Sequence, residues 1–193
     1  SLNNFFSQSP EEARRLALPQ KLSIPGTLLI SAVGVLEDVR RCVSMDLKRA
    51  GNVLALVAAP PEQFGLAPAA RAHHRVAEAI HERGVLAAHD VSDGGLGVAV
   101  AEMCIAGGLG VRFGIHEVPG VDPAAKLLED YPTAYLLECA DDAAIQRVGG
   151  VRLGTIIEEP RFIVSSGQGV VIDIALADLR VAWRAPLGAR MGG

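Results

Sequence analysis

A strand, a polar turn and a helix follow one another in the middle of this chain, and this run constrains the fold most. Residues 85–88 are apolar and follow a glycine, which suits a buried strand. Residues 96–106 contain no proline, and their apolar side chains share one helical face. That face comprises Leu96, Ala99, Val100, Met103 and Cys104. Gly107 and Gly108 end the helix, and Ser92 or Asp93 is expected to cap its start.

The turn between strand and helix carries polar residues that suit a phosphate and metal site. A helix N-terminus with unpaired N–H groups attracts anions, and Gly94 and Gly95 would let a phosphate approach the backbone closely. Asp90 and Asp93 offer carboxylates, which Mg²⁺ prefers together with phosphate oxygens. The same residue types are also ordinary helix caps and turn formers. From spacing alone, both interpretations stay open.

The composition excludes some function classes. Of 193 residues, 50% are hydrophobic but only 4% aromatic, so aliphatic side chains must build the core and favour a mixed α/β interior. A net charge of -4 without a dense basic cluster argues against nucleic-acid binding. The sequence contains no apolar run near the roughly 20 residues that a membrane-spanning helix needs, so no membrane partner is expected.

The cysteines indicate a cellular compartment, and the first residue indicates that the chain is part of a longer protein. Cys42, Cys104 and Cys139 are odd in number and widely spaced, which is typical of reduced, buried thiols in a cytoplasmic protein. The chain opens on Ser1 without an initiator methionine. We therefore expect it to begin within a longer protein.

Apolar runs and turn signals predict further elements before the central motif. Residues 27–35 are expected to form a buried strand, 42–45 a second strand and 53–59 a third. A domain boundary is placed near Gly51. The next predicted helix spans 68–83.

Three histidines on that predicted helix leave one alternative open. His74, Glu78 and His81 fall near one side, which makes a zinc site conceivable, although the spacing matches no standard motif. A solvated polar face is favoured.

Strands and helices alternate in the rest of the chain, which argues for a layered α/β or α+β domain. Strands are expected at 110–113, 135–139, 151–157, 161–164 and 169–174, and helices at 122–128 and 141–147.

Several separated stretches of the chain share one resemblance. The stretches are HDVSDGGL at 89–96, AEM at 101–103, GGLG at 107–110, SIPGTLLISAVGVLEDVR at 23–40, MDLK at 45–48, GN at 51–52, DLR at 178–180 and AWR at 182–184. Together they closely resemble the C-terminal region of the phosphoribosylformylglycinamidine synthase family, within the wider aminoimidazole ribonucleotide synthetase-like superfamily. The resemblance implies an α+β fold, a layered mixed α/β domain of the synthetase C-terminal type over 51–193. Residues 1–50 would be the last strands of a truncated synthetase N-terminal-type domain.

This resemblance implies an ATP-dependent C–N ligase of purine biosynthesis. Such enzymes use ATP and Mg²⁺ to convert formylglycinamide ribonucleotide into formylglycinamidine ribonucleotide, with ammonia that a glutaminase subunit or domain releases from glutamine. The expected partners are this substrate, the glutaminase and the remainder of the synthase, and the expected location is cytoplasmic. This chain alone is expected to be inactive.

The resemblance also implies roles for individual residues. Asp90 would be a magnesium ligand; Ser92, Gly94 and Gly95 would contact ATP or ADP; and Ser1 falls where the family places a substrate-contacting serine. No catalytic residue is assigned.

Two departures qualify these roles. The chain has PEQFGL at 61–66 in place of a Gly-Gly-Ser element, and EDYPTA at 129–134 in place of a Glu-Ser element followed by arginine. Both would weaken anion contacts. A structural, non-catalytic nucleotide-binding half and a sibling synthetase of the superfamily therefore remain as alternatives.

Overall fold

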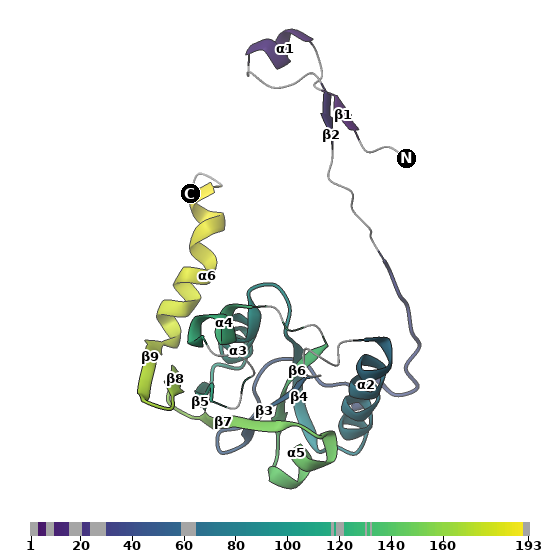
Figure 1. Cartoon of the computed structure of the whole chain (residues 1–193), viewed down its shortest axis with the longest axis vertical. Coiled ribbons are helices and arrows are strands. Elements are labelled where there is room, and N and C mark those ends of the chain that lie inside the picture. Colours follow the sequence, from purple (N-terminus) through teal and green to yellow (C-terminus); the bar gives the residue numbers. More distant parts are fainter. Residues whose placement is uncertain are drawn as a thin grey trace. The chain divides into compact units, whose positions relative to one another are not determined.

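The computed structural model describes the chain in two compact units. The described residues are 4–6, 10–15, 21–23, 30–58, 65–116, 118, 122–129, 131 and 133–190. The chain divides into a first unit of residues 1–37 and a second of residues 38–193 (Figure 1).

The first unit contains a small antiparallel pair of strands. Strand β1 (Asn4–Phe6) pairs with β2 (Lys21–Ser23), and α1 (Pro10–Arg15) lies between them in sequence.

Among the described residues of the second unit, seven strands form one mixed sheet in the order β4-β6-β3-β7-β5-β8-β9. The strands are β3 (Val53–Ala58), β4 (Val85–Asp90), β5 (Gly110–Gly114), β6 (Ala134–Cys139), β7 (Val151–Ile157), β8 (Arg161–Ser166) and β9 (Gly169–Ala175). The helices are η1 (Val39–Arg41), α2 (Leu66–His81), α3 (Gly95–Gly107), α4 (Pro123–Leu128), α5 (Asp142–Val148) and α6 (Leu176–Arg190). These elements confirm the layered α/β class expected from the sequence.

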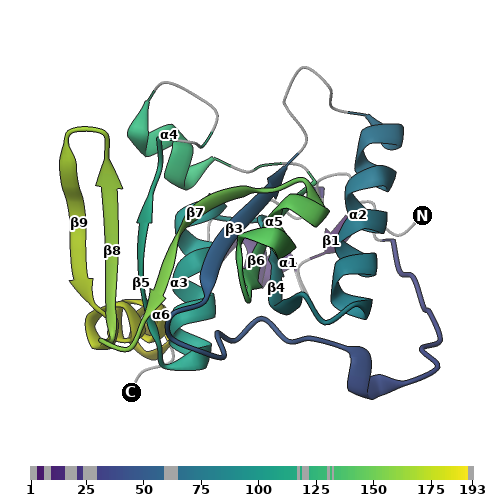
Figure 2. The ribbon, with the colours of Figure 1, turned by 90° about the horizontal axis from the view of Figure 1, so that it is seen from below.

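Strand β3 lies inside the sheet and is buried on both faces. Leu54 and Leu56 point into the core under α3, whereas Val53, Ala55 and Val57 point into the core under α2 and α5. Alternate residues of a strand face opposite sides, so an uninterrupted apolar run is what a doubly covered strand requires. Figures 1 and 2 show α2 and α5 on one face of the sheet and α3 on the other.

Most strand pairs are antiparallel, and β5 and β8 are parallel. Strand β4 is an edge strand that pairs with β6 alone. Because β4 lies at the sheet edge, the turn that leaves it toward α3 is accessible from outside.

Two predicted strands were wrong. Residues 30–36 are extended without strand pairing, and Val33 and Val35 are 97% and 95% exposed. Residues 42–45 likewise form no strand, although the Ala88 N–H donates to the Ser44 carbonyl at 3.2 Å. A strand exists only where a neighbour completes its hydrogen bonds, and local β propensity does not supply one. Residues 27–29 lie outside the described residues.

The other predicted elements are confirmed to within a few residues of their expected ends. Asp122 and Asp141 cap α4 and α5 by accepting hydrogen bonds from helix N–H groups, in agreement with the predicted acidic caps. The predicted boundary near Gly51, with domains at 1–50 and 51–193, stays a prediction. Within the described residues, no helix is both long enough and apolar enough to span a bilayer.

The cysteine prediction was right for two of three residues. Cys104 and Cys139 are buried free thiols, but Cys42 is exposed. Cys42 follows η1 in a segment without regular structure, where no helix or strand covers it.

Candidate functional site

The predicted motif forms the turn between edge strand β4 and helix α3. Asp90 is the last residue of β4 and lies opposite Tyr135 of β6. Val91 is buried, and its N–H donates to the Ala134 carbonyl at 3.0 Å. Ser92, Asp93 and Gly94 are exposed. The chain therefore presents a polar turn anchored by one apolar residue.

The helix cap differs from the prediction. Gly94, not Ser92 or Asp93, is the N-cap of α3, with a φ of 89° and no side-chain capping bond. Gly95 follows with a φ of 76°. Two successive left-handed residues suit glycine, because a Cβ is disfavoured there. The Gly95 N–H, which was expected to be free, donates a hydrogen bond to the Ser92 carbonyl at 2.9 Å.

Gly95 has a packing role that the sequence did not indicate. A Cβ on Gly95 would lie 2.6 Å from the carbonyl carbon of Leu128 and 2.7 Å from the carbonyl oxygen of Glu129. The backbone that follows α4 therefore approaches the first turn of α3 too closely for any side chain. Packing against this backbone therefore explains why position 95 is a glycine, whereas the neighbouring Gly94 is exposed.

The Asp90 carboxylate is exposed and linked to His89. Burial alone raises the pKa of Asp90, but hydrogen bonds from its own backbone, His89 and Ser92 outweigh burial and leave the pKa below its usual value. The Asp90 carboxylate is therefore ionised at neutral pH. Its side chain is 65% exposed, so water or another ligand can reach it.

His89 connects Asp90 to helix α3. Its Nδ1 lies 3.2 Å from Asp90 Oδ1, and its Nε2 lies 3.1 Å from Glu102 Oε2. The His89 side chain is only 14% exposed. Glu102 of α3 thereby holds one side of the imidazole, and the imidazole in turn fixes the orientation of the Asp90 carboxylate.

A second contact lies on the opposite face of the sheet, between β6 and α2. Tyr135 forms a hydrogen bond with His73 Nδ1 of α2, and the two rings meet edge to face with centroids 5.5 Å apart. Burial raises the pKa of Tyr135, and the negative charge of Asp90 raises it further. The Tyr135 phenol therefore stays neutral beside the Asp90 carboxylate.

The sequence had given signals for these supporting residues without assigning them roles. Glu102 is the one charged residue in helix α3, whose other side chains are apolar. His73 is one of three histidines on the predicted helix at 68–83, and Tyr135 falls within the predicted strand at 135–139. Their proximity depends on strand pairing that no local pattern specifies.

A single ionised carboxylate fits Mg²⁺ when a nucleotide supplies other ligands. Mg²⁺ is usually held by one or two carboxylates together with phosphate oxygens and water. In the described part of the chain, no three His, Cys, Asp or Glu side chains are arranged to hold a metal. The exposed Asp90 carboxylate is therefore a candidate for one such ligand.

The zinc alternative on α2 has other partners in the structure. His74 Nε2 lies 3.1 Å from Glu78 Oε1 at helical spacing, and both side chains are largely exposed. His81 instead contacts the Arg41 guanidinium, with 2.7 Å between Arg41 Nη1 and His81 Nε2. The side chains thus belong to the solvated polar face that the sequence favoured.

One predicted site residue has no structural test. Ser1, the expected substrate contact, lies outside the described residues. Parts of both departures from the family pattern, at 61–64, 130 and 132, also lie outside them.

The fold and this turn define a layered α/β domain with a polar strand–helix junction at the sheet edge. The family described as AIR synthase related protein, C-terminal domain, matches residues 51–172, and the chain belongs to this family.

The two curated relatives compared below are the same enzyme subunit from different organisms. The chain is 30% identical over 187 residues to phosphoribosylformylglycinamidine synthase subunit PurL of Thermoplasma acidophilum, covering 85% of this chain and 24% of that protein. It is 31% identical over 189 residues to the same subunit of Thermomicrobium roseum, covering 83% and 25%. The chain thus spans about a quarter of the length of these curated relatives.

Solved structures share the fold at lower identity. The Thermotoga maritima PurL complexed with FGAR has a TM-score of 0.65 at 17% identity, covering 73% of this chain and 30% of that one. The same protein complexed with ATP gives 0.62 at 19% identity, covering 72% and 27%. HypE of E. coli, a hydrogenase maturation protein, gives 0.52 at 17% identity, covering 69% and 51%.

Proposed function

We propose that this chain is part of a phosphoribosylformylglycinamidine synthase and holds a magnesium-bound adenine nucleotide at the β4–α3 turn. Asp90 is the proposed metal ligand, with Ser92 and Gly94 as nucleotide contacts. Gly95 stays in the proposed nucleotide set, although its N–H donates to the Ser92 carbonyl and its Cα packs against the backbone that follows α4. The observation that carries the proposal is the exposed, ionised Asp90 carboxylate at an open glycine turn.

In the parent enzyme, ATP would phosphorylate the amide oxygen of formylglycinamide ribonucleotide and leave ADP. Ammonia from a glutaminase partner would then add to the activated carbon, and phosphate would depart to give formylglycinamidine ribonucleotide. Mg²⁺ would neutralise charge on the phosphates when bound. Phosphoryl transfer of this kind depends mainly on oriented donors and metal clamps, which the turn can supply without a nucleophilic side chain.

Within this scheme, the chain's own residues orient charge. Glu102 fixes His89, and His89 holds the Asp90 carboxylate in one orientation. A preorganised carboxylate loses less freedom when the magnesium–nucleotide complex binds. Ser1 remains the proposed substrate contact, and a cytoplasmic location remains part of the proposal.

Calorimetric titration of the chain with ADP, with and without Mg²⁺, tests the nucleotide site. We expect Mg²⁺ to strengthen ADP binding in the wild type and Asp90→Asn to abolish that gain. Asp93→Asn is the matched control, because Asp93 is an exposed carboxylate of the same turn. No ADP binding in the wild type, or an equal magnesium gain in Asp90→Asn, would contradict the site.

A second function is favoured by the packing of Gly95. Because α4 closes on the first turn of α3, this half could hold a nucleotide for structural purposes and contribute no chemistry. Turnover of the full-length parent enzyme distinguishes a nucleotide that reacts from one that is structural. Asp90→Asn slows turnover if the bound nucleotide reacts, whereas it lowers stability and leaves turnover per folded enzyme unchanged if the nucleotide is structural.

A further inference from the structure

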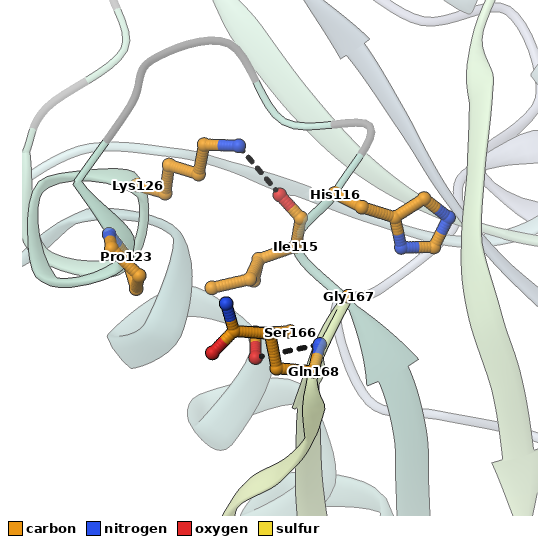
Figure 3. Close-up of a pocket in the computed structure, with 7 residues that line it drawn as sticks. All are labelled: Ile115, His116, Pro123, Lys126, Ser166, Gly167 and Gln168. Carbon is orange, nitrogen blue, oxygen red and sulfur yellow. Dashed lines mark hydrogen bonds between the residues drawn. The ribbon is translucent and has the colours of Figure 1, made fainter.

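A separate pocket lies at the opposite end of α4 from the contact with Gly95. It measures about 510 Å³ and is lined by the residues directly after β5, by α4, and by the end of β8 with the turn toward β9 (Figure 3). Its lining residues are Ile115, His116, Pro123, Lys126, Ser166, Gly167 and Gln168. This volume falls within the roughly 300–1,000 Å³ typical of small-molecule sites.

Lys126 supplies a positive charge at this pocket. Its ammonium donates to the Ile115 carbonyl at 3.1 Å, which fixes the side chain above the pocket (Figure 3). An ammonium group has three hydrogens, and the described residues account for one of them. Lys126 makes no ion pair with a described carboxylate. The group is therefore held in place with donors to spare.

The turn between β8 and β9 adds neutral donors. The Gln168 N–H donates to Ser166 Oγ at 3.4 Å, which keeps the turn closed. Figure 3 shows the Gln168 carboxamide reaching from the turn toward Ile115 and Pro123, whose side chains form an apolar wall. The imidazole of His116 points to the other side of Ile115 (Figure 3).

The charge balance of the pocket favours an anion. Among the described lining residues there is no Asp or Glu, although the whole chain carries a net charge of -4. The nearby Asp122 carboxylate is turned to the start of α4, where it accepts from the N–H groups of Ala124 and Ala125 at 3.3 Å. Among the described lining residues, Lys126 thus faces the pocket without a neighbouring carboxylate.

We propose that this pocket binds a small organic anion through carboxylate or phosphate oxygens. Lys126 is the charged partner, the Gln168 amide is the neutral donor, and Ile115 and Pro123 contact the apolar part of the ligand. The site shares no lining residue with the β4–α3 turn.

Titration of the isotope-labelled chain with inorganic phosphate and, separately, with malonate tests this site by amide chemical shifts at constant ionic strength. We expect saturable shifts at Ile115, in α4 and at Gln168. Lys126→Met weakens the affinity at least tenfold, and Gln168→Leu weakens it severalfold. Binding of phosphate alone or of malonate alone identifies which oxygen chemistry the site takes.

Matched controls separate this pocket from general charge effects. Lys48→Met removes a lysine whose ammonium contacts Ser44 Oγ at 2.7 Å, and Gln146→Leu changes an exposed glutamine of α5. Both controls bind as the wild type does. Gln168 lies in an exposed turn, so its substitution leaves the fold intact even if Lys126→Met does not fold.

Shifts that do not saturate, or equal affinity in the wild type and Gln168→Leu, overturn the proposal. Asp90→Asn leaves anion binding at this pocket unchanged, so the result is independent of the proposed nucleotide site.

Discussion

The backbone N–H of Lys48 donates to the Glu138 carboxylate at 2.6 Å, across 90 residues of sequence. Glu138 lies on β6 and is fully buried. Its other oxygen accepts from the Arg49 N–H at 3.0 Å and from the Asn52 amide at 2.6 Å. One carboxylate therefore holds the segment that leads into β3 against strand β6.

Replacing Glu138 tests this anchor. Glu138→Leu removes the acceptor of the part-buried Lys48 and Arg49 N–H groups and of the buried Asn52 amide, and we expect the free energy of unfolding to fall by about 3 kcal/mol or more. Urea unfolding measures the change. The exposed Glu158→Gln is the control and should stay within about 0.5 kcal/mol of the wild type. A loss for Glu138→Leu no larger than that of the control would refute the anchor.

Gly95 tests the close contact between α3 and α4. Gly95→Ala meets both a left-handed backbone and the Leu128 carbonyl carbon at 2.6 Å, so we expect a loss of about 3 kcal/mol. Gly108→Ala has a similar φ of 70° with nothing within 4 Å of the added Cβ, and it should lose only about 1 kcal/mol. Equal losses in urea unfolding would show that packing against α4 contributes nothing.

The three cysteines differ in reactivity. Burial raises the pKa of Cys104 to about 12, and burial together with Asp141 and Glu138 raises that of Cys139 to about 11. At pH 8 a disulfide reagent should modify Cys42 alone in the folded chain and all three thiols in urea. Cys42→Ser abolishes the folded-state reaction. Rapid modification of that variant without denaturant would disagree with the fold.

The same thiols make stability depend on alkaline pH. An unfolded thiol ionises near pH ~8.5, whereas the buried thiols stay neutral until about pH 11. Their stabilising contribution is therefore complete below pH ~8.5 and is lost as pH rises, by up to about 1.4 kcal/mol per pH unit for each thiol. Cys104→Ala reduces this slope in urea unfolding between pH 9 and 11, compared at each pH with the wild type.

Glu102 tests how the Asp90 carboxylate is positioned. We expect Glu102→Gln to weaken the magnesium-dependent part of ADP binding about tenfold, because His89 loses its charged partner on α3 and is left with Asp90 alone. Binding of ADP without Mg²⁺ should not change. Glu78→Gln, at the exposed pair with His74, is the control. A loss of equal size with and without Mg²⁺ would indicate a structural effect instead.

The exposed segment before η1 shows where local patterns mislead. The apolar residues from Ile30 to Leu36 have the composition of a buried strand, but a strand also needs a hydrogen-bonded neighbour and a covered face. Among the described residues, no strand pairs with this segment and no element covers it, and Val33 is therefore 97% exposed. A sequence pattern indicates that a segment can form a strand, but it does not show whether a neighbouring strand is there to pair with it.

The sequence by itself indicated most strands and helices of the second unit and the polar turn between β4 and α3, but neither η1 nor α6. Apolar periodicity, glycines and acidic caps act over a few residues, so they can be recognised in the sequence without knowledge of the fold. Tertiary structure alone decided the sheet order, which brings Asp90 beside Tyr135 and Glu138 beside Lys48. It also decided that α4 closes on Gly95. These contacts join residues far apart in sequence, and only the packing of the sheet between its helices places them together.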